Sequence, residues 1–192
     1  MGGETDRRDF FAELARRVLG RAAEFVESKL PSPPPISLKL LRPPGAIDET
    51  RFVDACQRCG KCVEVCPARA IKPVESESRA LNGTPFIDAD LAACVVCDGL
   101  LCTHVCPSGA LLPVAMPAHI NMGLAKVYET SCLRTNGEDC RICVERCPLG
   151  ASAILIVESQ TTPVVIPDGC VGCGVCQYYC PTTPKAIVVQ PN

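Results

Sequence analysis

The stretch that decides the fold is CQRCGKCVEVCP, residues 56–67, in which four cysteines are spaced C-x2-C-x2-C-x3-C and the last is followed by Pro67. The ending C-x3-C-P occurs four times in the chain. The second group widens the middle gap to four residues, the third widens the first gap to seven, and the fourth repeats the first spacing. These groups use all 16 cysteines of the 192-residue chain: Cys56, Cys59, Cys62 and Cys66; Cys94, Cys97, Cys102 and Cys106; Cys132, Cys140, Cys143 and Cys147; and Cys170, Cys173, Cys176 and Cys180.

This spacing suits an iron-sulfur cluster. Thiolates two residues apart on a tight loop can occupy three corners of a cubane, and the fourth cysteine must then reach elsewhere. In two-cluster ferredoxins, the C-x2-C-x2-C-x3-C-P run sends that fourth cysteine to the other cluster. A proline after it fixes φ and offers no amide hydrogen, which suits a sharp change of direction. Sixteen thiolates, taken four per cluster, predict four 4Fe-4S clusters with every cysteine a ligand.

Two other uses of cysteine fit less well. Disulfides explain an even cysteine count, but they do not require four C-x3-C-P endings, and we see no secretory signal. Zinc sites with four thiolates are built from two separated C-x2-C pairs. Here each group compresses its four cysteines into 11 to 16 residues. The spacing therefore favours iron-sulfur clusters over both.

The remaining composition agrees with a core built around metal. The chain has no Trp, three Tyr and five Phe, so the large rings that usually dominate core burial are scarce. The formal net charge of −2 gives no basic excess and argues against a nucleic-acid partner. No apolar run reaches the ~18 residues that cross a bilayer, which argues against a transmembrane protein.

Short apolar runs flank the cysteine groups. Runs separated by Asn82-Gly83 or by residues 161–163 predict small hairpins that link one cluster loop to the next. We also expect a one-turn helix after each Cys-Pro. The predicted fold class is α+β, with tandem bacterial-ferredoxin-like dicluster units, short β-hairpins, one-turn helices and an N-terminal amphipathic helix. The runs are residues 70–74, 110–114, 153–157 and 186–189 after the groups, and 85–87, 126–128 and 164–166 before them.

The first 50 residues contain no cysteine. Apolar side chains at helical spacing over residues 9–30 predict an amphipathic helix, which occupies most of an N-terminal segment, residues 1–30. Residues 31–47 read as a proline-rich linker, and residues 48–192 as the domain that binds four clusters, entered through a short helix from Asp48 to Ala55. Two interpretations of the amphipathic helix stay open: it docks to a membrane surface or partner, or it folds back on the cluster domain.

The run Asp6-Arg7-Arg8-Asp9-Phe10-Phe11 resembles the core of a twin-arginine export signal. Such a signal needs an apolar stretch of ~7 to 15 residues after its arginines. Charged residues interrupt that stretch here. We therefore expect a cytoplasmic protein, peripheral to the membrane where the amphipathic helix docks; periplasmic location by twin-arginine export is the alternative. The interrupting residues are Glu13, Arg16, Arg17, Arg21 and Glu24.

The order and spacing of the four groups resemble those of NapG/MauM-type polyferredoxins, the quinol-dehydrogenase ferredoxin subunits of periplasmic nitrate reduction and methylamine utilisation systems. The stretches LRPPGA (41–46), CQRCGKC (56–62) and NMG (121–123) strengthen the similarity, which covers about residues 38 to 190. The resemblance implies a protein that passes electrons from a membrane-bound iron-sulfur partner to a periplasmic redox chain.

The same ligand set also resembles the four-cluster β subunits of molybdopterin oxidoreductases, in which motif one pairs with four and motif two with three. That resemblance implies an alternative, an electron-transfer subunit bound tightly to a molybdopterin or flavin enzyme. Two pairings stay open from the residues themselves. The two regular motifs lie outermost, which suggests nesting, and strands flank groups three and four as a unit, which suggests sequential pairing.

The predicted function is transfer of single electrons through four clusters, between a redox donor such as a membrane quinol-oxidising partner and an acceptor enzyme. No catalytic constellation is apparent: the two histidines are His104 and His119, and no Ser or Cys nucleophile free of ligand duty pairs with a base. We therefore expect redox proteins as partners and no catalysis by the chain alone.

Overall fold

The structure, a computed structural model, describes residues 39–192, which form one unit. The amphipathic helix predicted over residues 9–30 and the first part of the predicted linker lie outside the described residues. Along the described chain the helices and strands are α2 (Glu49–Ala55), α3 (Lys61–Glu64), β1 (Ile71–Pro73), β2 (Pro85–Ile87), α4 (Leu101–His104), β3 (Gly123–Val127), α5 (Ile142–Glu145), β4 (Ile154–Leu155), β5 (Val164–Val165), α6 (Val175–Tyr179) and β6 (Ile187–Pro191).

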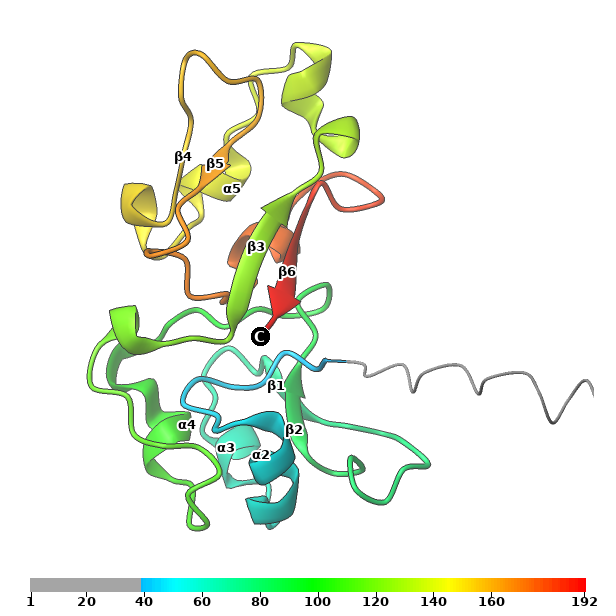
Figure 1. The fold of residues 1–192 in the computed structure, drawn as a ribbon, viewed down its shortest axis with the longest axis vertical. Helices are drawn as coiled ribbons and strands as arrows, with labels where there is room; N and C mark the ends of the chain where they lie inside the picture. Colours follow the sequence, from blue (N-terminus) through cyan, green and yellow to red (C-terminus); the bar gives the residue numbers. More distant parts are fainter. Residues whose placement is uncertain (1–38) are drawn as a thin grey trace, which may run out of the picture. The chain divides into compact units, whose positions relative to one another are not determined.

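The described chain has two lobes, which we define as the first lobe (residues 39–120) and the second lobe (residues 121–192). Figure 1 shows α2, α3, α4, β1 and β2 gathered in the first lobe, and β3, β4, β5, β6 and α5 in the second. Each lobe contains one antiparallel hairpin, β1 with β2 and β4 with β5. The two hairpins connect groups one and two, and groups three and four, as the sequence predicted.

Groups two and three are not linked by a hairpin of their own. Residues 110–114 form no strand; Leu111 makes an isolated bridge with Ala46 and packs beside Phe52. The run before group three belongs to β3, which pairs antiparallel with the C-terminal β6, Gly123 opposite Pro191 and Val127 opposite Ile187. Burial explains this arrangement, because Leu111 gains more from packing beside Phe52 than from an isolated two-stranded ribbon.

The one-turn helices α3, α4, α5 and α6 each begin one residue before the third cysteine of a group. The prediction that a one-turn helix follows each Cys-Pro is therefore wrong, although a 3-10 turn (Gly150–Ser152) does follow Pro148. The reason lies in the spacing. Three residues separate the third cysteine from the fourth, which is one helical turn, and the proline after the fourth cysteine cannot continue the helix.

Residues 41–44, which the sequence placed in the linker, are buried in the first lobe. Arg42 holds them there: its Nε and Nη2 donate to the two carboxylate oxygens of Glu49 at 2.8 and 2.5 Å, and its Nη1 donates to Thr84 Oγ1 at 3.0 Å. The guanidinium also lies over the Phe52 ring, 4.7 Å from its centre. This part of the expected linker thus belongs to the packed unit. Helix α2 matches its prediction, with Asp48 as its N-cap.

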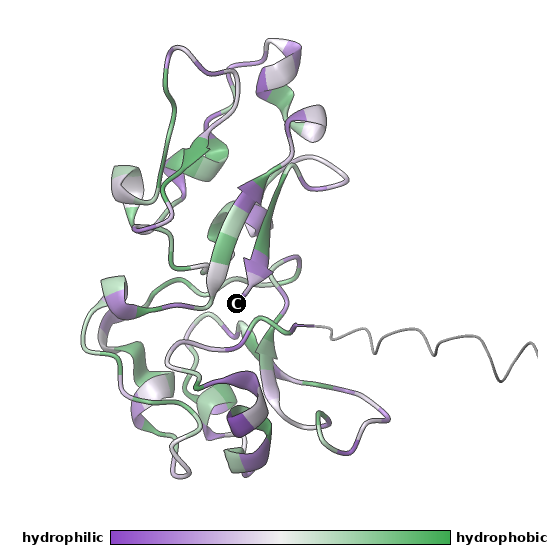
Figure 2. Ribbon diagram, in the orientation of Figure 1, coloured by the Kyte–Doolittle hydropathy of each residue, from purple (hydrophilic) through white to green (hydrophobic). Residues whose placement is uncertain are grey.

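The core consists of small aliphatic side chains and of cysteines. Phe52 is the one aromatic ring buried among the described residues, and Cys102, Cys132, Cys173 and Cys180 are themselves buried in the larger core cluster. Hydrophobic residues colour β5 and the adjacent part of α5 in the second lobe (Figure 2). Within residues 39–192, no helix has both the length and the apolar character needed to span a membrane.

Candidate functional site

The 16 cysteines line four cavities, with four cysteines at each. We number these sites I to IV. Site I is lined by Cys56, Cys59, Cys62 and Cys106; site II by Cys66, Cys94, Cys97 and Cys102; site III by Cys147, Cys170, Cys173 and Cys176; and site IV by Cys132, Cys140, Cys143 and Cys180.

Every site takes its first three cysteines from one group and its fourth from another. Site I receives the last cysteine of group two and site II the last of group one; sites III and IV exchange in the same way between groups three and four. This is the exchange known from two-cluster ferredoxins. The pairing is therefore sequential, one with two and three with four, and differs from the nested pairing of the molybdopterin-enzyme β subunits.

Local backbone geometry brings the thiols inward. Gly60 and Gly174, the residues before α3 and α6, have φ of 75° and 85°, values that residues with a Cβ adopt only at a cost. They turn the chain between the second and third cysteines of their groups. The third cysteine then lies in the first turn of the helix, and the fourth leaves at its end. The spacing of the motif thus sends one cysteine of each group away from the other three.

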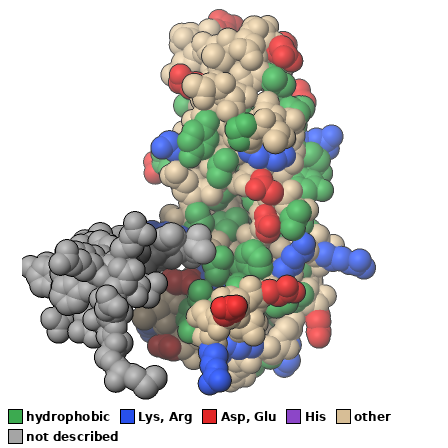
Figure 3. Space-filling view, turned by 90° about the vertical axis from the view of Figure 1, so that its right-hand side faces the viewer, with side chains coloured by type: hydrophobic (Ala, Val, Ile, Leu, Met, Phe, Trp, Pro, Cys, Tyr) green, Lys and Arg blue, Asp and Glu red, His purple; other side chains and the backbone are tan. Residues whose placement is uncertain are grey.

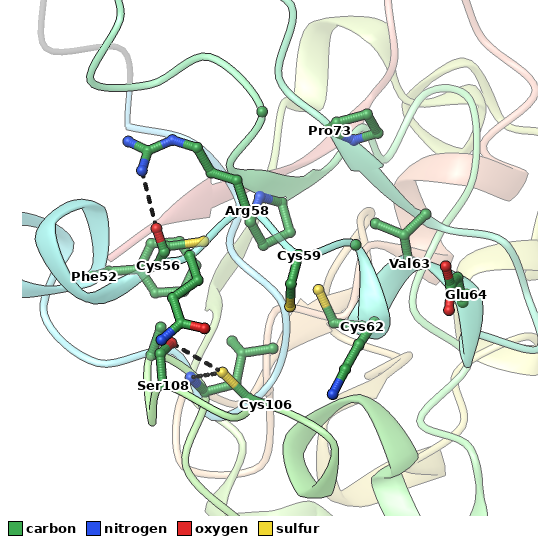
Figure 4. A pocket seen from close by; sticks show the side chains of 17 residues that line it. Phe52, Cys56, Arg58, Cys59, Cys62, Val63, Glu64, Pro73, Cys106 and Ser108 are labelled. Carbon is green, nitrogen blue, oxygen red and sulfur yellow. Dashed lines mark hydrogen bonds between the residues drawn. The ribbon is translucent and has the colours of Figure 1, made fainter.

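Site I is the widest of the four. Figure 4 shows the sulfurs of Cys56, Cys59, Cys62 and Cys106 facing a common space below Arg58. The cavity volume is about 350 Å³ at this site and about 30, 20 and 20 Å³ at sites IV, III and II. Cys59 is also the only cysteine classed as exposed among the 16. Site I is therefore the one most open to the surroundings.

The four sites form a row in the order I, II, III, IV. Cys62 of site I and Cys66 of site II are one helical turn apart in the chain, and so are Cys143 of site IV and Cys147 of site III. Sites II and III are neighbours through the backbone hydrogen bond from Cys94 to Cys173. Sites I and II lie within the first lobe and sites III and IV within the second, so the step from II to III crosses between lobes.

The two lobes contact each other, between sites II and III, through closely packed backbone. The Cys94 N–H donates to the carbonyl of Cys173 at 3.0 Å, which joins a residue of site II to one of site III directly. A Cβ added to Gly174 would lie 2.8 Å from the Cβ of Ala89, and one added to Gly172 would lie 2.5 Å from backbone atoms of Gly123. Real Cβ atoms essentially never approach so closely. Glycine at position 174 therefore permits the approach of the two lobes, whereas glycine at position 172 permits close packing against β3 within the second lobe.

Burial dominates the electrostatics of the metal-free thiols. It raises the pKa of Cys62 and Cys143 to about 11, and that of Cys94 and Cys102 to about 12, with neighbouring thiols adding to the effect. The pKa of Cys176 is raised further for the same reason. Clustered thiols with raised pKa values bind metal only as they lose their protons, so a cation of high charge at each site is the partner that would offset their mutual repulsion.

Cys106 and Cys180 behave differently. Burial acts to raise the pKa of both thiols, but hydrogen bonds outweigh it and the pKa is lowered. Cys106 accepts from the Leu111 N–H at 3.4 Å and contacts Ser108 Oγ at 3.6 Å. Cys180 contacts Thr182 Oγ1 at 3.2 Å. These are the cysteines exchanged into sites I and IV.

Two arginines near the sites, Arg58 and Arg134, donate hydrogen bonds to backbone carbonyls. Arg58 donates to the carbonyls of Cys56, Ala80 and Asn82 at 3.0, 2.7 and 3.0 Å, which ties the β1–β2 turn to site I. Arg134 donates to the carbonyl of Thr161 at 3.0 Å and to Asp139 at 3.0 Å, which ties the β4–β5 turn to group three. Sequence reasoning missed these roles, because their partners are carbonyls that carry no residue-type signal.

The donor set fits a cluster better than a single ion. No three Cys, His, Asp or Glu side chains between residues 39 and 192 converge as they would around one metal ion. The thiols instead surround cavities, and all-thiolate sites of four cysteines are the ligand set of a 4Fe-4S cubane. Both histidines are exposed on the surface. The arrangement can hold and tune an electron carrier.

Comparison with known proteins agrees with this chemistry. Residues 55–110 match the family model of a 4Fe-4S dicluster domain, a span that contains groups one and two and hence sites I and II. The fold and its cysteines thus define a ferredoxin-type protein of the 4Fe-4S class.

The relatives narrow the class to one family. The chain is 38% identical to the methylamine utilization ferredoxin-type protein MauM of Methylobacillus flagellatus, over 97% of this chain and 84% of that protein. It is 36% identical to the ferredoxin-type protein NapG of Escherichia coli, over 98% and 87%, and 34% identical to MauM of Paracoccus denitrificans, over 97% and 88%. The chain belongs to this family of MauM and NapG ferredoxin-type proteins.

Proposed function

We propose that this protein binds four 4Fe-4S clusters, one at each of sites I to IV, and relays single electrons along that row. The observation that carries the proposal is that each cavity is lined by four cysteines, three from one group and one from its neighbour. When bound, such clusters supply one-electron redox chemistry at potentials set by charge, hydrogen bonds and exposure. The tandem dicluster fold follows from the same proposal, one dicluster unit in each lobe.

The protein's own residues order and insulate the path. The pairs Cys62/Cys66 and Cys143/Cys147 make site I a neighbour of site II and site IV a neighbour of site III, and the Cys94 to Cys173 backbone contact joins sites II and III at the centre of the row. Buried aliphatic side chains surround the inner sites II and III, including Leu100, Ile154 and Val171. The ends of the row are sites I and IV. We assign electron transfer with a partner protein to site I, because its Cys59 is exposed.

The proposed partners are other redox proteins. The names of two relatives place them in methylamine utilization, and by the family resemblance we propose a membrane quinol-oxidising protein as donor and an enzyme or redox protein as acceptor. Acidic and basic side chains are interspersed over the face shown in Figure 3. That pattern suits a protein partner better than a nucleic acid, which selects a basic surface.

Metal analysis tests the proposal directly. Protein purified without oxygen should contain about 16 iron and 16 sulfide per chain, and reduction should give the EPR spectra of reduced cubanes. Fewer than about 12 iron in fully reconstituted protein, or about four zinc in place of iron, would contradict it.

Single ligand replacements test the assignment of cysteines to sites. Cys106→Ser should remove or alter the cluster of site I and leave that of site II, whereas Cys66→Ser should do the reverse. Both changes should leave sites III and IV intact. A change in Cys66 that damages the cluster held by group four would support nested pairing and contradict the row proposed here.

A deletion tests the role proposed for the predicted helix over residues 9–30, which is docking to a partner or membrane surface. Removing residues 1–30 should preserve the iron content and weaken association with membranes or with the partner. Loss of iron would favour the interpretation in which this segment folds back on the cluster domain. Co-purification of the full chain with a molybdopterin or flavin enzyme would favour the alternative of a tightly bound subunit.

A further inference from the structure

The residue two positions after the exchanged cysteine divides the four sites into two kinds. In the groups that send their last cysteine to an outer site, this position carries a hydroxyl: Ser108 after Cys106 and Thr182 after Cys180. In the groups that supply an inner site, the same position carries Ala68 or Leu149. The hydroxyl therefore follows the cysteine given to each outer site and is absent after the cysteine given to each inner site.

The two hydroxyls touch sulfur. Ser108 Oγ lies 3.6 Å from Cys106 Sγ, and Thr182 Oγ1 lies 3.2 Å from Cys180 Sγ. A thiolate can only accept, so in the metal-bound form the hydroxyl is the donor. Thr182 is already oriented for this, because its oxygen accepts the Ala186 N–H at 2.9 Å and its own hydrogen is left for the sulfur. Within residues 39–192 these two are the side-chain hydroxyls that contact a cysteine sulfur.

We propose that Ser108 and Thr182 raise the reduction potentials of the clusters at sites I and IV above those at sites II and III. The inference rests on the proposed function, since it assumes a cluster at each site. Reduction adds one electron from an external donor to a cluster; no bond breaks, and the hydroxyl hydrogen stays on its oxygen. A hydrogen bond to a ligand sulfur stabilises the added negative charge, so it favours the reduced state.

The consequence is a row with two favourable ends and a less favourable middle. The first two electrons that enter the protein reside at sites I and IV, and each lobe holds one of them. Passage between the lobes then requires transient reduction of sites II and III. Solvent exposure acts in the same direction at site I, where Cys59 is exposed, but site IV is narrower, so the hydroxyl of Thr182 is the cleaner test.

The test is a redox titration followed by EPR on protein with its iron counted. Thr182→Val and Ser108→Ala should each shift one of the four midpoint potentials downward and leave the iron content unchanged. Ser152→Ala is the matched control, because its hydroxyl donates to the Leu149 carbonyl near site III and not to a sulfur. It should leave all four potentials in place. Unchanged potentials in both hydroxyl variants would overturn the inference.

A variant that adds a hydroxyl tests the inference even if a variant that removes one loses its cluster. Ala68→Ser introduces a hydroxyl at the equivalent position of the group that supplies site II, and it should shift one midpoint potential upward. In the unaltered protein, the first two electrons should give magnetically isolated signals, because two sites separate I from IV. Coupled signals at that stage would contradict the inference, whereas fewer than four clusters would contradict the proposed function itself.

Discussion

The outer site of each lobe takes three cysteines from one loop. In the loop of site I, in the first lobe, two residues separate the first two cysteines, whereas in the loop of site IV, in the second lobe, seven residues separate them. Both loops end in the same C-x3-C-P, and both send the fourth cysteine to the neighbouring site. The extra residues of the second lobe include a 3-10 turn (Leu133–Asn136), whose first residue, Leu133, lines site IV. The exchange of the last cysteine is thus the conserved part of the geometry within this molecule, and the spacing before it is free to vary.

The lobes also differ in how they are held together. The first lobe has α2, the buried Arg42 and the buried Phe52 beside site I, whereas the second lobe has the five-residue ribbon of β3 and β6. Each lobe nevertheless ties its hairpin turn to its outer group with an arginine, Arg58 in one and Arg134 in the other. A common arrangement of four-cysteine sites is thus supported by two different protein scaffolds.

Removal of the iron is expected to have the largest effect, and it should affect both lobes alike. Because cysteines of all four sites lie in or against the cores, loss of the metal should unfold residues 50–192 in large part. Circular dichroism and limited proteolysis after anaerobic chelation measure this. A second lobe that stays folded without iron would show that its ribbon, and not the metal, holds it together.

Replacement of Arg42 should lower the stability of the first lobe and leave that of the second lobe unchanged. Arg42→Ala removes hydrogen bonds to Glu49, Thr84 and the Pro85 carbonyl, and leaves buried acceptors unpaired. We expect a loss of about 2–4 kcal/mol in the free energy of unfolding, confined to the first lobe. Denaturation of the cluster-loaded protein, followed by cluster absorbance, measures it. Arg51→Ala on the exposed side of the same helix should change stability by less than about 0.5 kcal/mol.

Replacement of Gly174 should disturb the contact between the lobes. Gly174→Ala places a Cβ 2.8 Å from Ala89, and the overpacking should cost about 1–3 kcal/mol and weaken the magnetic coupling between clusters at sites II and III. Gly137→Ala is a matched control, since Gly137 has φ of 86°, close to the 85° of Gly174, but nothing lies within 4 Å of its added Cβ. Equal effects of the two changes would mean that only backbone strain matters.

The smallest effects should come from the arginines at the hairpin turns. Arg58→Ala loses hydrogen bonds to three carbonyls, one of them part-buried, and Arg134→Ala loses exposed hydrogen bonds to one carbonyl and to Asp139. We therefore expect about 1 kcal/mol or less from each, with the larger loss from Arg58. Hydrogen exchange over residues 78–84 and 158–163 reports on the two turns separately. Faster exchange in the wrong lobe would contradict the pairing of each arginine with its own hairpin.

Much of this molecule could be predicted from cysteine spacing and strand patterns. The hairpins at Asn82-Gly83 and at residues 161–163, helix α2 and the exchange of the fourth cysteine all follow from local signals. The β3–β6 ribbon and the burial of residues 41–44 could not be predicted, because they depend on contacts between distant parts of the chain. The choice between nested and sequential pairing is of the same kind, since the ligands are identical under both.

Sequential pairing has a consequence for how the protein is made. Sites I and II use only cysteines between residues 56 and 106, and sites III and IV only those between residues 132 and 180. During synthesis the first lobe therefore has its full set of ligands before translation of the second lobe is complete, and domains generally fold as units from the N-terminus. Metal can therefore be inserted into the two lobes in independent steps. In a nested arrangement, the sites of group one would lack a ligand until group four, near the C-terminus, had been synthesised.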